Sequence, residues 1–126
     1  VVGKGSHNNF LSNVVDNIKK NNEVVASNPR ALFNNIIHIN KLSEFIFFLL
    51  TEKIKGFHVT NVGSAEPITI NKVLKIIFSK LVKEGKFRYI TSKNKPFLIS
   101  LKKAKQLGFS PETVTQSINN YLKEII

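Results

Sequence analysis

Residues 57–70 read FHVTNVGSAEPITI, and within this stretch the sequence changes from a strand pattern to the start of a helix. Residues 57–63 are rich in β-branched and aromatic side chains and predict a strand, and residues 64–67 predict a loop. Thr69 stands where a helix N-cap is expected. Apolar side chains then recur at helical spacing over residues 70–84, and Gly85 ends the predicted helix. This strand, loop and helix in succession indicate a mixed α/β protein.

The sequence downstream of this unit keeps alternating between the two patterns. Residues 87–91 predict a strand. Ser100 is expected to cap a short helix that ends at Gly108, with Phe109 placed for the hydrophobic contact of a Schellman ending. Ser110 and Pro111 are expected to start the final helix, with proline at its first position. That helix carries one apolar stripe, made of Val114, Ile118, Tyr121, Leu122 and Ile125.

The sequence upstream alternates in the same way. A first amphipathic helix is predicted from Phe10 to Ile18, after an Asn8-Asn9 cap. Residues 23–27 and 32–39 predict two strands. The helix predicted over residues 42–54 is apolar on more than one face, so we expect it to be buried on several sides or to meet a partner surface. Alternating helices and strands predict an α/β arrangement with at least some parallel pairing.

Composition excludes several classes of protein. The chain has 126 residues, 42% of them hydrophobic, and no cysteine, which excludes disulfides, thiolate metal sites and a cysteine nucleophile. Its longest apolar run, residues 45–50, is short of the roughly 20 residues that a membrane-spanning helix needs. We therefore predict a soluble, cytoplasmic protein. The chain starts at Val1 and holds no methionine, so we expect it to be part of a longer protein.

The net charge of +11 comes from 17 lysines and only two arginines against eight acids. Lysine binds phosphate as a point charge, whereas base reading relies on the arginine fork. Nucleic acid is therefore an improbable partner. A small basic domain that binds nucleic acid or another polyanion nevertheless stays open as the alternative function. It predicts binding with a steep dependence on salt.

Tyr89 and Lys93 match the Tyr-x-x-x-Lys pair in which a lysine lowers the pKa of a phenol for acid–base work. That chemistry needs both residues on one helix face. In a strand, a four-residue offset separates them by roughly 13 Å rather than about 6 Å. Because residues 87–91 predict a strand, we assign no catalytic role to the pair, and the sequence contains no complete active site.

The turn Gly3-Lys4-Gly5-Ser6 enters the first helix, but it lacks the spacing of a phosphate loop or of a full dinucleotide fingerprint. With Lys4 and His7 beside a helix N-terminus, the turn could still hold an anion. The three histidines are far apart and have no acidic cluster near them, so no metal site is predicted. His38 is expected to be a structural, hydrogen-bonded residue.

Four segments resemble, in order, the C-terminal portion of extended short-chain dehydrogenases, the NAD(P)-dependent nucleotide-sugar epimerases, dehydratases and reductases. The opening VVGKG is similar to the family's Val-Tyr-Gly-Pro-Gly turn, and FNNIIHINKL at 33–42 to its Arg-Asp-Phe-Ile-His-Val-Asp-Asp-Leu segment. The stretch 57–70 resembles Tyr-Asn-Val-Gly-Ser-Gly-Glu-Pro-Thr-Thr. KAKQLGFSP at 103–111 resembles Ser-Lys-Ala-x-x-Leu-Gly-Phe-x-Pro. The resemblance spans nearly the whole chain.

The resemblance implies that residues 1–126 form the substrate-binding portion of a Rossmann-type enzyme and lack its N-terminal dinucleotide-binding half. That half would hold NAD or NADP and the catalytic Tyr-Lys pair, and residues 33–55 would pack on its sheet. A nucleotide sugar would be the substrate, and homodimer formation stays open. Carried over by position, the substrate-binding residues are Lys4, Ser6, Asn9, Phe10, Asn34, Asn61 and Ser64.

Three departures from the family pattern matter. The arginine that often contacts the nucleotide phosphates falls on Asn34, the two acids before the helix fall on Asn40 and Lys41, and a usual glycine is Ala65. Asparagine cannot form the bidentate clamp that arginine makes on a phosphate. Phosphate binding is then redistributed to lysines such as Lys4, or the activity is altered. A catalytically silent relative that keeps the fold for scaffolding is a third hypothesis.

Overall fold

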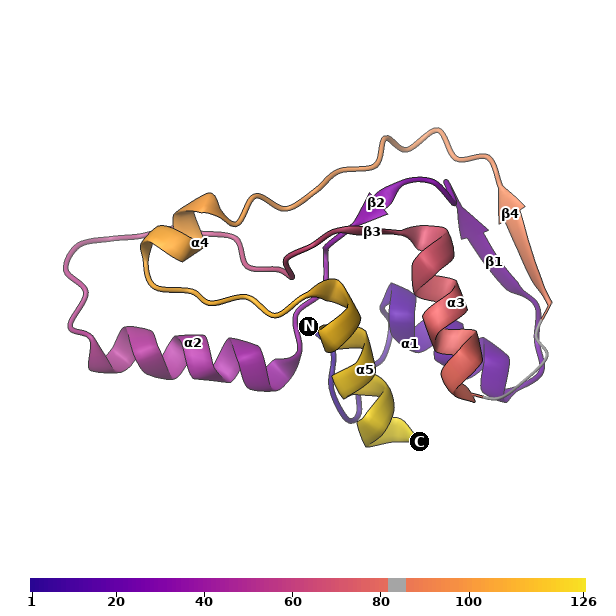
Figure 1. The fold of residues 1–126 in the computed structure, drawn as a ribbon, viewed down its shortest axis with the longest axis horizontal. Coiled ribbons are helices and arrows are strands. Elements are labelled where there is room, and N and C mark those ends of the chain that lie inside the picture. Colours follow the sequence, from indigo (N-terminus) through magenta and orange to yellow (C-terminus); the bar gives the residue numbers. More distant parts are fainter. Residues whose placement is uncertain (82–85) are drawn as a thin grey trace.

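The computed structural model describes residues 1–81 and 86–126. In that part of the chain, helices and short strands alternate in the predicted manner (Figure 1). The elements in chain order are α1 (Phe10–Lys19), β1 (Val24–Ser27), β2 (Leu32–Phe33), α2 (Ile39–Thr51), β3 (Ile68–Thr69), α3 (Ile70–Leu81), β4 (Phe87–Ile90), α4 (Lys102–Gln106) and α5 (Val114–Ile125).

The strands form two small sheets. β1 pairs in parallel with β4, with Val24 opposite Phe87, and β2 pairs antiparallel with β3. Two isolated parallel bridges, Val2 with His38 and Ala65 with Thr113, connect segments far apart in sequence. The predicted α/β fold with parallel pairing is therefore confirmed.

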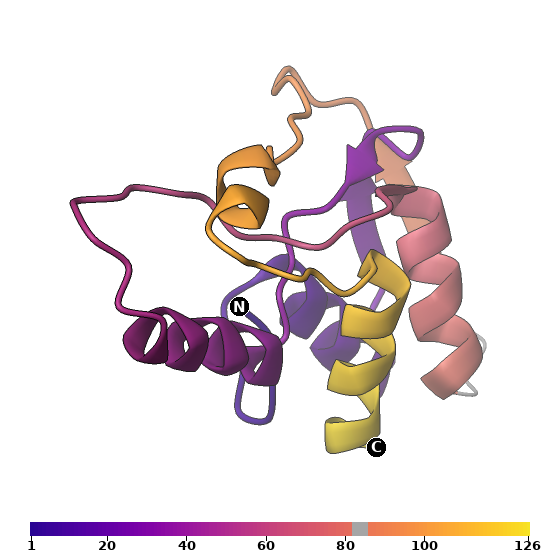
Figure 2. The same cartoon turned by 60° about the vertical axis from the view of Figure 1, so that its left-hand side comes forward.

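The main core is the cluster of buried apolar side chains among α1, α3, α5 and β1. α3 packs against both α1 and α5, and α1 also contacts β1, so three helices share one interior (Figure 2). Each helix buries the apolar face that its spacing predicts. The fully buried side chains include Leu11, Leu74, Ile77, Ile118 and Leu122.

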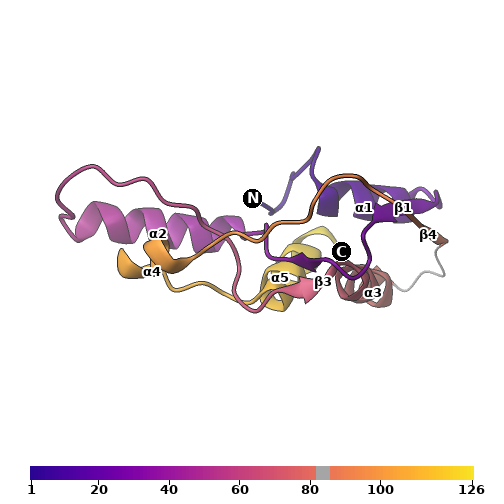
Figure 3. The ribbon, with the colours of Figure 1, turned by 90° about the horizontal axis from the view of Figure 1, so that it is seen from above.

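The small core lies under α2 and α4, which extend to one side of the molecule while α1, α3 and α5 lie on the other (Figure 3). Its buried members are Ile37, Phe45, Ala104 and Phe109. Gly108 closes α4 with a positive φ of 100°, and a Cβ there would collide with the Phe48 ring of α2. This glycine therefore allows the close approach of the two helices.

Several helix ends follow the sequence prediction. Asn9 caps α1 by accepting from Ser12 N, and Thr69 Oγ1 accepts from Lys72 N in the first turn of α3. At the end of α4, Phe109 N donates to Ala104 O at 2.9 Å and Gly108 N donates to Lys105 O at 3.0 Å. These two bonds are the Schellman pattern, so the predicted ending is confirmed.

Two predicted strands are corrected. Residues 57–63 form no strand, because no described segment pairs with them, and Phe57 and Val59 are exposed. Residues 32–39 form a strand only at β2, after which Asn34 turns inward and Ile39 already begins α2. A β-rich sequence forms a strand only where a partner satisfies its backbone groups.

Two predicted helix starts are corrected as well. Ser100 makes no cap, since α4 has Leu101 in that position without a side-chain bond. The final helix begins three residues after Pro111, because Thr113 and Gln116 form a reciprocal capping box that fixes its start. The predicted end of α3 at Gly85 lies outside the described residues.

Candidate functional site

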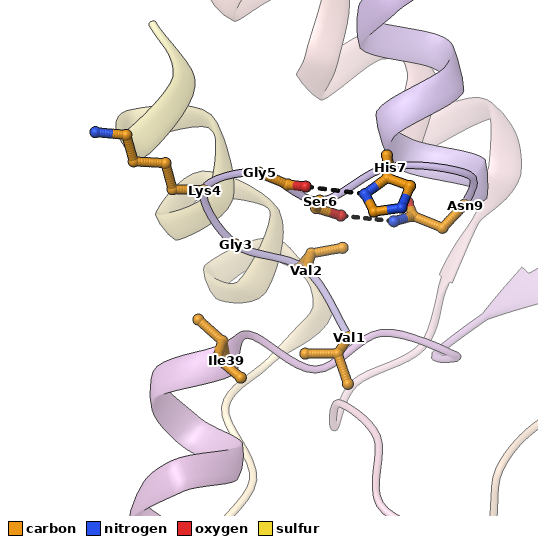
Figure 4. A pocket seen from close by; sticks show the side chains of 9 residues that line it. All are labelled: Val1, Val2, Gly3, Lys4, Gly5, Ser6, His7, Asn9 and Ile39. Atoms are coloured by element: carbon orange, nitrogen blue, oxygen red, sulfur yellow. Dashed lines mark hydrogen bonds between the residues drawn. The ribbon is translucent and has the colours of Figure 1, made fainter.

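The N-terminal turn lines a surface hollow with a volume of about 330 Å³, which we call the first hollow (Figure 4). Val2 N donates to Ile37 O and Ile39 N donates to Val2 O, so the turn is anchored to the start of α2. A Cβ at Gly3 would lie 2.6 Å from Ile39 Cγ2, so glycine is required there. The lining residues are Val1, Val2, Gly3, Lys4, Gly5, Ser6, His7, Asn9 and Ile39.

Three predicted site residues, Lys4, Ser6 and Asn9, meet at this hollow. Asn9 Nδ2 donates to Ser6 Oγ at 2.6 Å, while Asn9 Oδ1 accepts from Ser12 N at the start of α1. Lys4 turns its side chain away from the turn (Figure 4), and its backbone N donates to Glu124 Oε2 at 2.8 Å. The polar groups of the turn thus bond mainly to one another.

Glu124 of α5 joins this turn to α2. Its second oxygen lies 3.3 Å from Nε2 of His38, without the alignment of a hydrogen bond, and His38 is 2% exposed. His38 Nδ1 accepts from Asn40 N at 3.4 Å and caps α2. The predicted structural role of His38 is confirmed.

Two further predicted site residues are buried. Ser64 Oγ donates to Ile36 O at 2.8 Å and lies 2.6 Å from Ser117 Oγ of α5. Asn34 donates from Nδ2 to Ile99 O at 2.9 Å and accepts at Oδ1 from Ile99 N at 2.8 Å. Ser64 N also donates to Asn34 O at 3.2 Å. These polar atoms hold neighbouring segments of the chain together.

The last two predicted residues lie apart from each other. Phe10 opens α1, and its ring is 5.7 Å from the ring of Phe33. Asn61 is exposed in the long loop between α2 and β3. The structure therefore brings Lys4, Ser6 and Asn9 together, places Phe10 against Phe33 and Asn34 beside Ser64, and leaves Asn61 by itself.

A second hollow, of about 200 Å³, lies between the residues around β2 and the segment 91–100, which we call the strap. The strap has no regular secondary structure and runs along the top of Figure 1 from β4 to α4. The hollow is lined by Ser27, Asn28, Ala31, Leu32, Phe33, Asn35, Ile70, Ser92, Asn94, Lys95, Pro96 and Phe97.

Sequence reasoning missed this second hollow. Its two walls are more than fifty residues apart in sequence, and neither carries a compact motif. The chemistry of the lining is nevertheless specific. Phe33 and Phe97 offer aromatic surface, asparagine amides offer donors and acceptors, and Lys95 offers a positive charge. Such a set suits a ligand that joins a flat ring to an anion.

The Tyr89 and Lys93 pair has no catalytic geometry. Tyr89 lies in β4, and its hydroxyl donates to Asn71 Oδ1 at 2.8 Å. Burial raises the pKa of the Tyr89 phenol, whereas proton abstraction by a phenolate needs a lowered pKa. Among the described residues there is no group of three or more His, Cys, Asp or Glu side chains placed to hold a metal. No described helix is long and apolar enough to cross a membrane.

No protein-family model matches the chain, and no curated protein matches it in sequence. Solved structures do match its fold. The dTDP-glucose 4,6-dehydratase of Bacillus anthracis str. Ames, in complex with NAD, is 18% identical with a TM-score of 0.71, and the match covers 93% of this chain and 38% of that enzyme. The UDP-N-acetylglucosamine 4-epimerase of Methanobrevibacter ruminantium M1, in complex with UDP-N-acetylmuramic acid, is 15% identical with a TM-score of 0.74, covering 98% and 41%.

A third match is the dTDP-4-dehydrorhamnose reductase of Yersinia enterocolitica, 16% identical with a TM-score of 0.74, covering 98% of this chain and 46% of that enzyme. This chain therefore spans less than half the length of each of these enzymes. At such identities the likeness establishes the fold. The resemblance to extended short-chain dehydrogenases and the α/β fold class are confirmed at that level.

Proposed function

We propose that this chain is the nucleotide-sugar-binding portion of an NAD(P)-dependent epimerase, dehydratase or reductase of the extended short-chain dehydrogenase type. The observation that carries the proposal is the asymmetric overlap. The fold match takes in 93% of this chain but only 38% of the dehydratase, and the proportions are similar for the epimerase and the reductase. A domain of a larger enzyme would overlap in this way.

The second hollow is the proposed nucleotide site. A nucleoside base can lie against the rings of Phe33 or Phe97, and amides such as that of Asn35 can bond to its edge. Lys95 is placed to bind the diphosphate as a point charge. The first hollow, with Lys4, Ser6 and Asn9, is the proposed contact for the sugar end of the substrate, because Asn9 directly precedes Phe10, whose ring packs against Phe33 of the second hollow.

The cofactor does not fit this chain alone. The turn before α1 lacks the dinucleotide spacing, and the capping box of Asn9 and Ser12 takes up the backbone N–H groups of these two residues. We therefore propose that NAD or NADP, which would supply hydride transfer, binds mainly in an N-terminal half outside this chain. We assign no catalytic residue to residues 1–126.

That N-terminal half would also cover the open surface of residues 33–55. Ile46, Phe47 and Leu50 project from α2 with exposed fractions of 49%, 69% and 77%. Residues 57–63 have a strand sequence and no partner among the described residues. A sheet contributed by the N-terminal half would bury these apolar side chains of α2 and pair with residues 57–63. We expect the assembled protein in the cytoplasm, and its sedimentation will show whether it is a homodimer.

Calorimetric titration of the chain with UDP and with dTDP tests the nucleotide site. We expect binding that weakens about tenfold or more in Lys95→Ala, because a charge-assisted contact to phosphate is lost. Lys93→Ala is the matched control, since Lys93 is an exposed lysine of the strap that does not line the hollow. Equal binding by both variants, or no binding at millimolar nucleotide, would contradict the proposal.

A further inference from the structure

The strap has few attachments to the rest of the molecule. No backbone–backbone hydrogen bond joins residues 91–100 to any other described part of the chain. The hydrogen bonds that join the strap to the rest of the described chain are made by two asparagine side chains. Asn28 Nδ2 donates to Asn94 O at 3.3 Å, and Asn34 makes its two bonds to Ile99. The strap is therefore held at two points, with the stronger attachment at Asn34.

The attachment at Asn34 is built into the fold. Asn34 is only 3% exposed, and its amide imitates a neighbouring strand by bonding to both the N–H and the C=O of one residue. A Cβ at Gly63 would lie 2.8 Å from Asn34 O and 3.6 Å from the Ile99 side chain. The absence of a side chain at Gly63 thus lets the backbone carbonyl of Asn34 approach residue 63, next to Ile99.

The hydrogen bonds between Asn34 and Ile99 also hold one wall of the second hollow in place. Phe33 and Asn35, on either side of Asn34, both line it, while the Asn34 amide bonds to the strap. The opposite wall, residues 94–97, lies between the two attachment points on the strap. Loss of the bonds at Ile99 would let that wall, with Lys95 and Phe97, move away from Phe33.

We propose that Asn34 is a positioning residue that fixes the strap over the second hollow and thereby sets the affinity of the hollow for a nucleotide diphosphate. This inference rests on the proposed nucleotide site. Arginine occupies this position in the family pattern and often contacts the phosphates. In this chain the side chain at position 34 holds the wall that presents Lys95.

Hydrogen exchange of the strap amides tests the positioning independently of any ligand. In Asn34→Ala we expect exchange at the Ile99 amide, which donates to Asn34 Oδ1, to rise at least about tenfold, because its acceptor is lost. Protection in α1, α3 and α5 should be retained. Asn13→Ala, at an exposed asparagine of α1, is the matched control and should leave the strap unchanged. Unchanged exchange at the Ile99 amide in Asn34→Ala would overturn the proposal.

Asn34→Asp adds a readout that a purely structural role would not move. A neutral carboxyl group can accept from Ile99 N and donate to Ile99 O, whereas the carboxylate can only accept. Burial raises the pKa of such a carboxyl group. Relative to the unsubstituted chain at each pH, we expect strap protection and UDP affinity to be low at neutral pH and to recover together at mildly acidic pH.

The same titrations separate the two proposals. Failure of the unsubstituted chain to bind UDP would overturn the proposed function, and the positioning role with it. If the unsubstituted chain binds UDP, a loosened strap with unchanged UDP affinity in Asn34→Ala would overturn the positioning role alone. A loosened strap with affinity reduced about tenfold is the expected result.

Discussion

The main core and the small core use helices of similar length in different ways. α5 has 12 residues and buries one stripe, including Val114, Ile118 and Leu122, against α3 in the main core. α2 has 13 residues and a much higher apolar content, yet Phe45 is the one buried residue of this fully described helix. The more apolar helix is thus the less buried one.

The helical positions of α2 explain this difference. At about 100° per residue, Phe45 and Leu49 lie on the inner face, whereas Ile39, Ile46, Phe47 and Leu50 share an outer arc about 100° wide. The outer four are 42% to 77% exposed. A helix with two apolar faces has its second face available for a partner, and this exposed face of α2 is the one that the proposed N-terminal half would cover. The main core, by contrast, buries the apolar faces of α1, α3 and α5 within this chain.

Replacing a main-core isoleucine should have the largest effect on this contrast. Ile118 is 0% exposed, and Ile118→Ala is expected to lower the free energy of unfolding by about 2–5 kcal/mol through lost burial and a cavity. Ile46→Ala, on the outer face of α2, is the matched control and should cost less than about 0.5 kcal/mol. Urea unfolding measures the free energy of unfolding of both variants. Equal losses in the two variants would contradict the difference between the buried face of α5 and the exposed outer face of α2.

Replacing Gly108, which follows α4 and lies against the Phe48 ring of α2, should destabilise the small core selectively. Gly108→Ala forces a Cβ against the Phe48 ring at a positive φ, at a cost of about 1–3 kcal/mol. We expect hydrogen exchange to rise in α2 and α4 while the main core stays protected.

The control for that substitution is Gly5→Ala. Gly5 also has a positive φ, of 82°, but nothing lies within 4 Å of its added Cβ. The stability loss of Gly5→Ala should therefore report the backbone strain at positive φ without a side-chain collision. Faster exchange in α1 and α5 of Gly108→Ala would mean that the two cores unfold as one unit.

Alkaline pH should weaken the main core slightly. Burial, and then the charge of Asp16, raise the pKa of the Tyr121 phenol above its ordinary value of 10.0. A raised folded-state pKa means that the folded protein holds the proton more tightly, so the contribution of Tyr121 to stability is constant below pH 10.0 and is lost as the pH rises through the folded-state pKa. Unfolding of Tyr121→Phe measured across this range should show a smaller alkaline decline, and an identical decline would exclude this origin.

Polar substitutions on the outer face of α2 should have the smallest effect on stability. Phe47→Ser and Leu50→Ser alter side chains that are 69% and 77% exposed, so the free energy of unfolding should change by less than about 0.5 kcal/mol. They should reduce association with the proposed N-terminal half, measured by co-purification. Phe45→Ser, at a residue 6% exposed, is the contrasting variant and should destabilise the small core. A stability loss in the outer variants equal to that of Phe45→Ser would contradict the assignment of faces.

The sequence was sufficient for some features that depend on neighbouring residues, but not for the helix starts expected at Ser100 and Pro111. The cap at Asn9, the cap at Thr69 and the ending at Gly108 and Phe109 are all local hydrogen-bonding patterns, and all three are found. The second apolar face of α2 was likewise visible from spacing alone.

Features that depend on distant partners could not be predicted. Residues 57–63 have a strand composition, but a strand needs a neighbour, and composition does not say whether one is present. The second hollow depends on Asn34 reaching Ile99 across 65 positions of sequence. No local pattern marks that contact, so the residues of the strap were absent from the predicted site.

Mapping the chain by NMR while UDP is added tests the central claim most directly. The account predicts saturable amide shifts at residues 27–35, at Ile70 and at residues 92–97, with α5 and the outer face of α2 unaffected, and a response that survives moderate salt. Shifts spread over the exposed lysines, reproduced by duplex DNA and abolished by salt, would contradict it and favour a polyanion-binding domain.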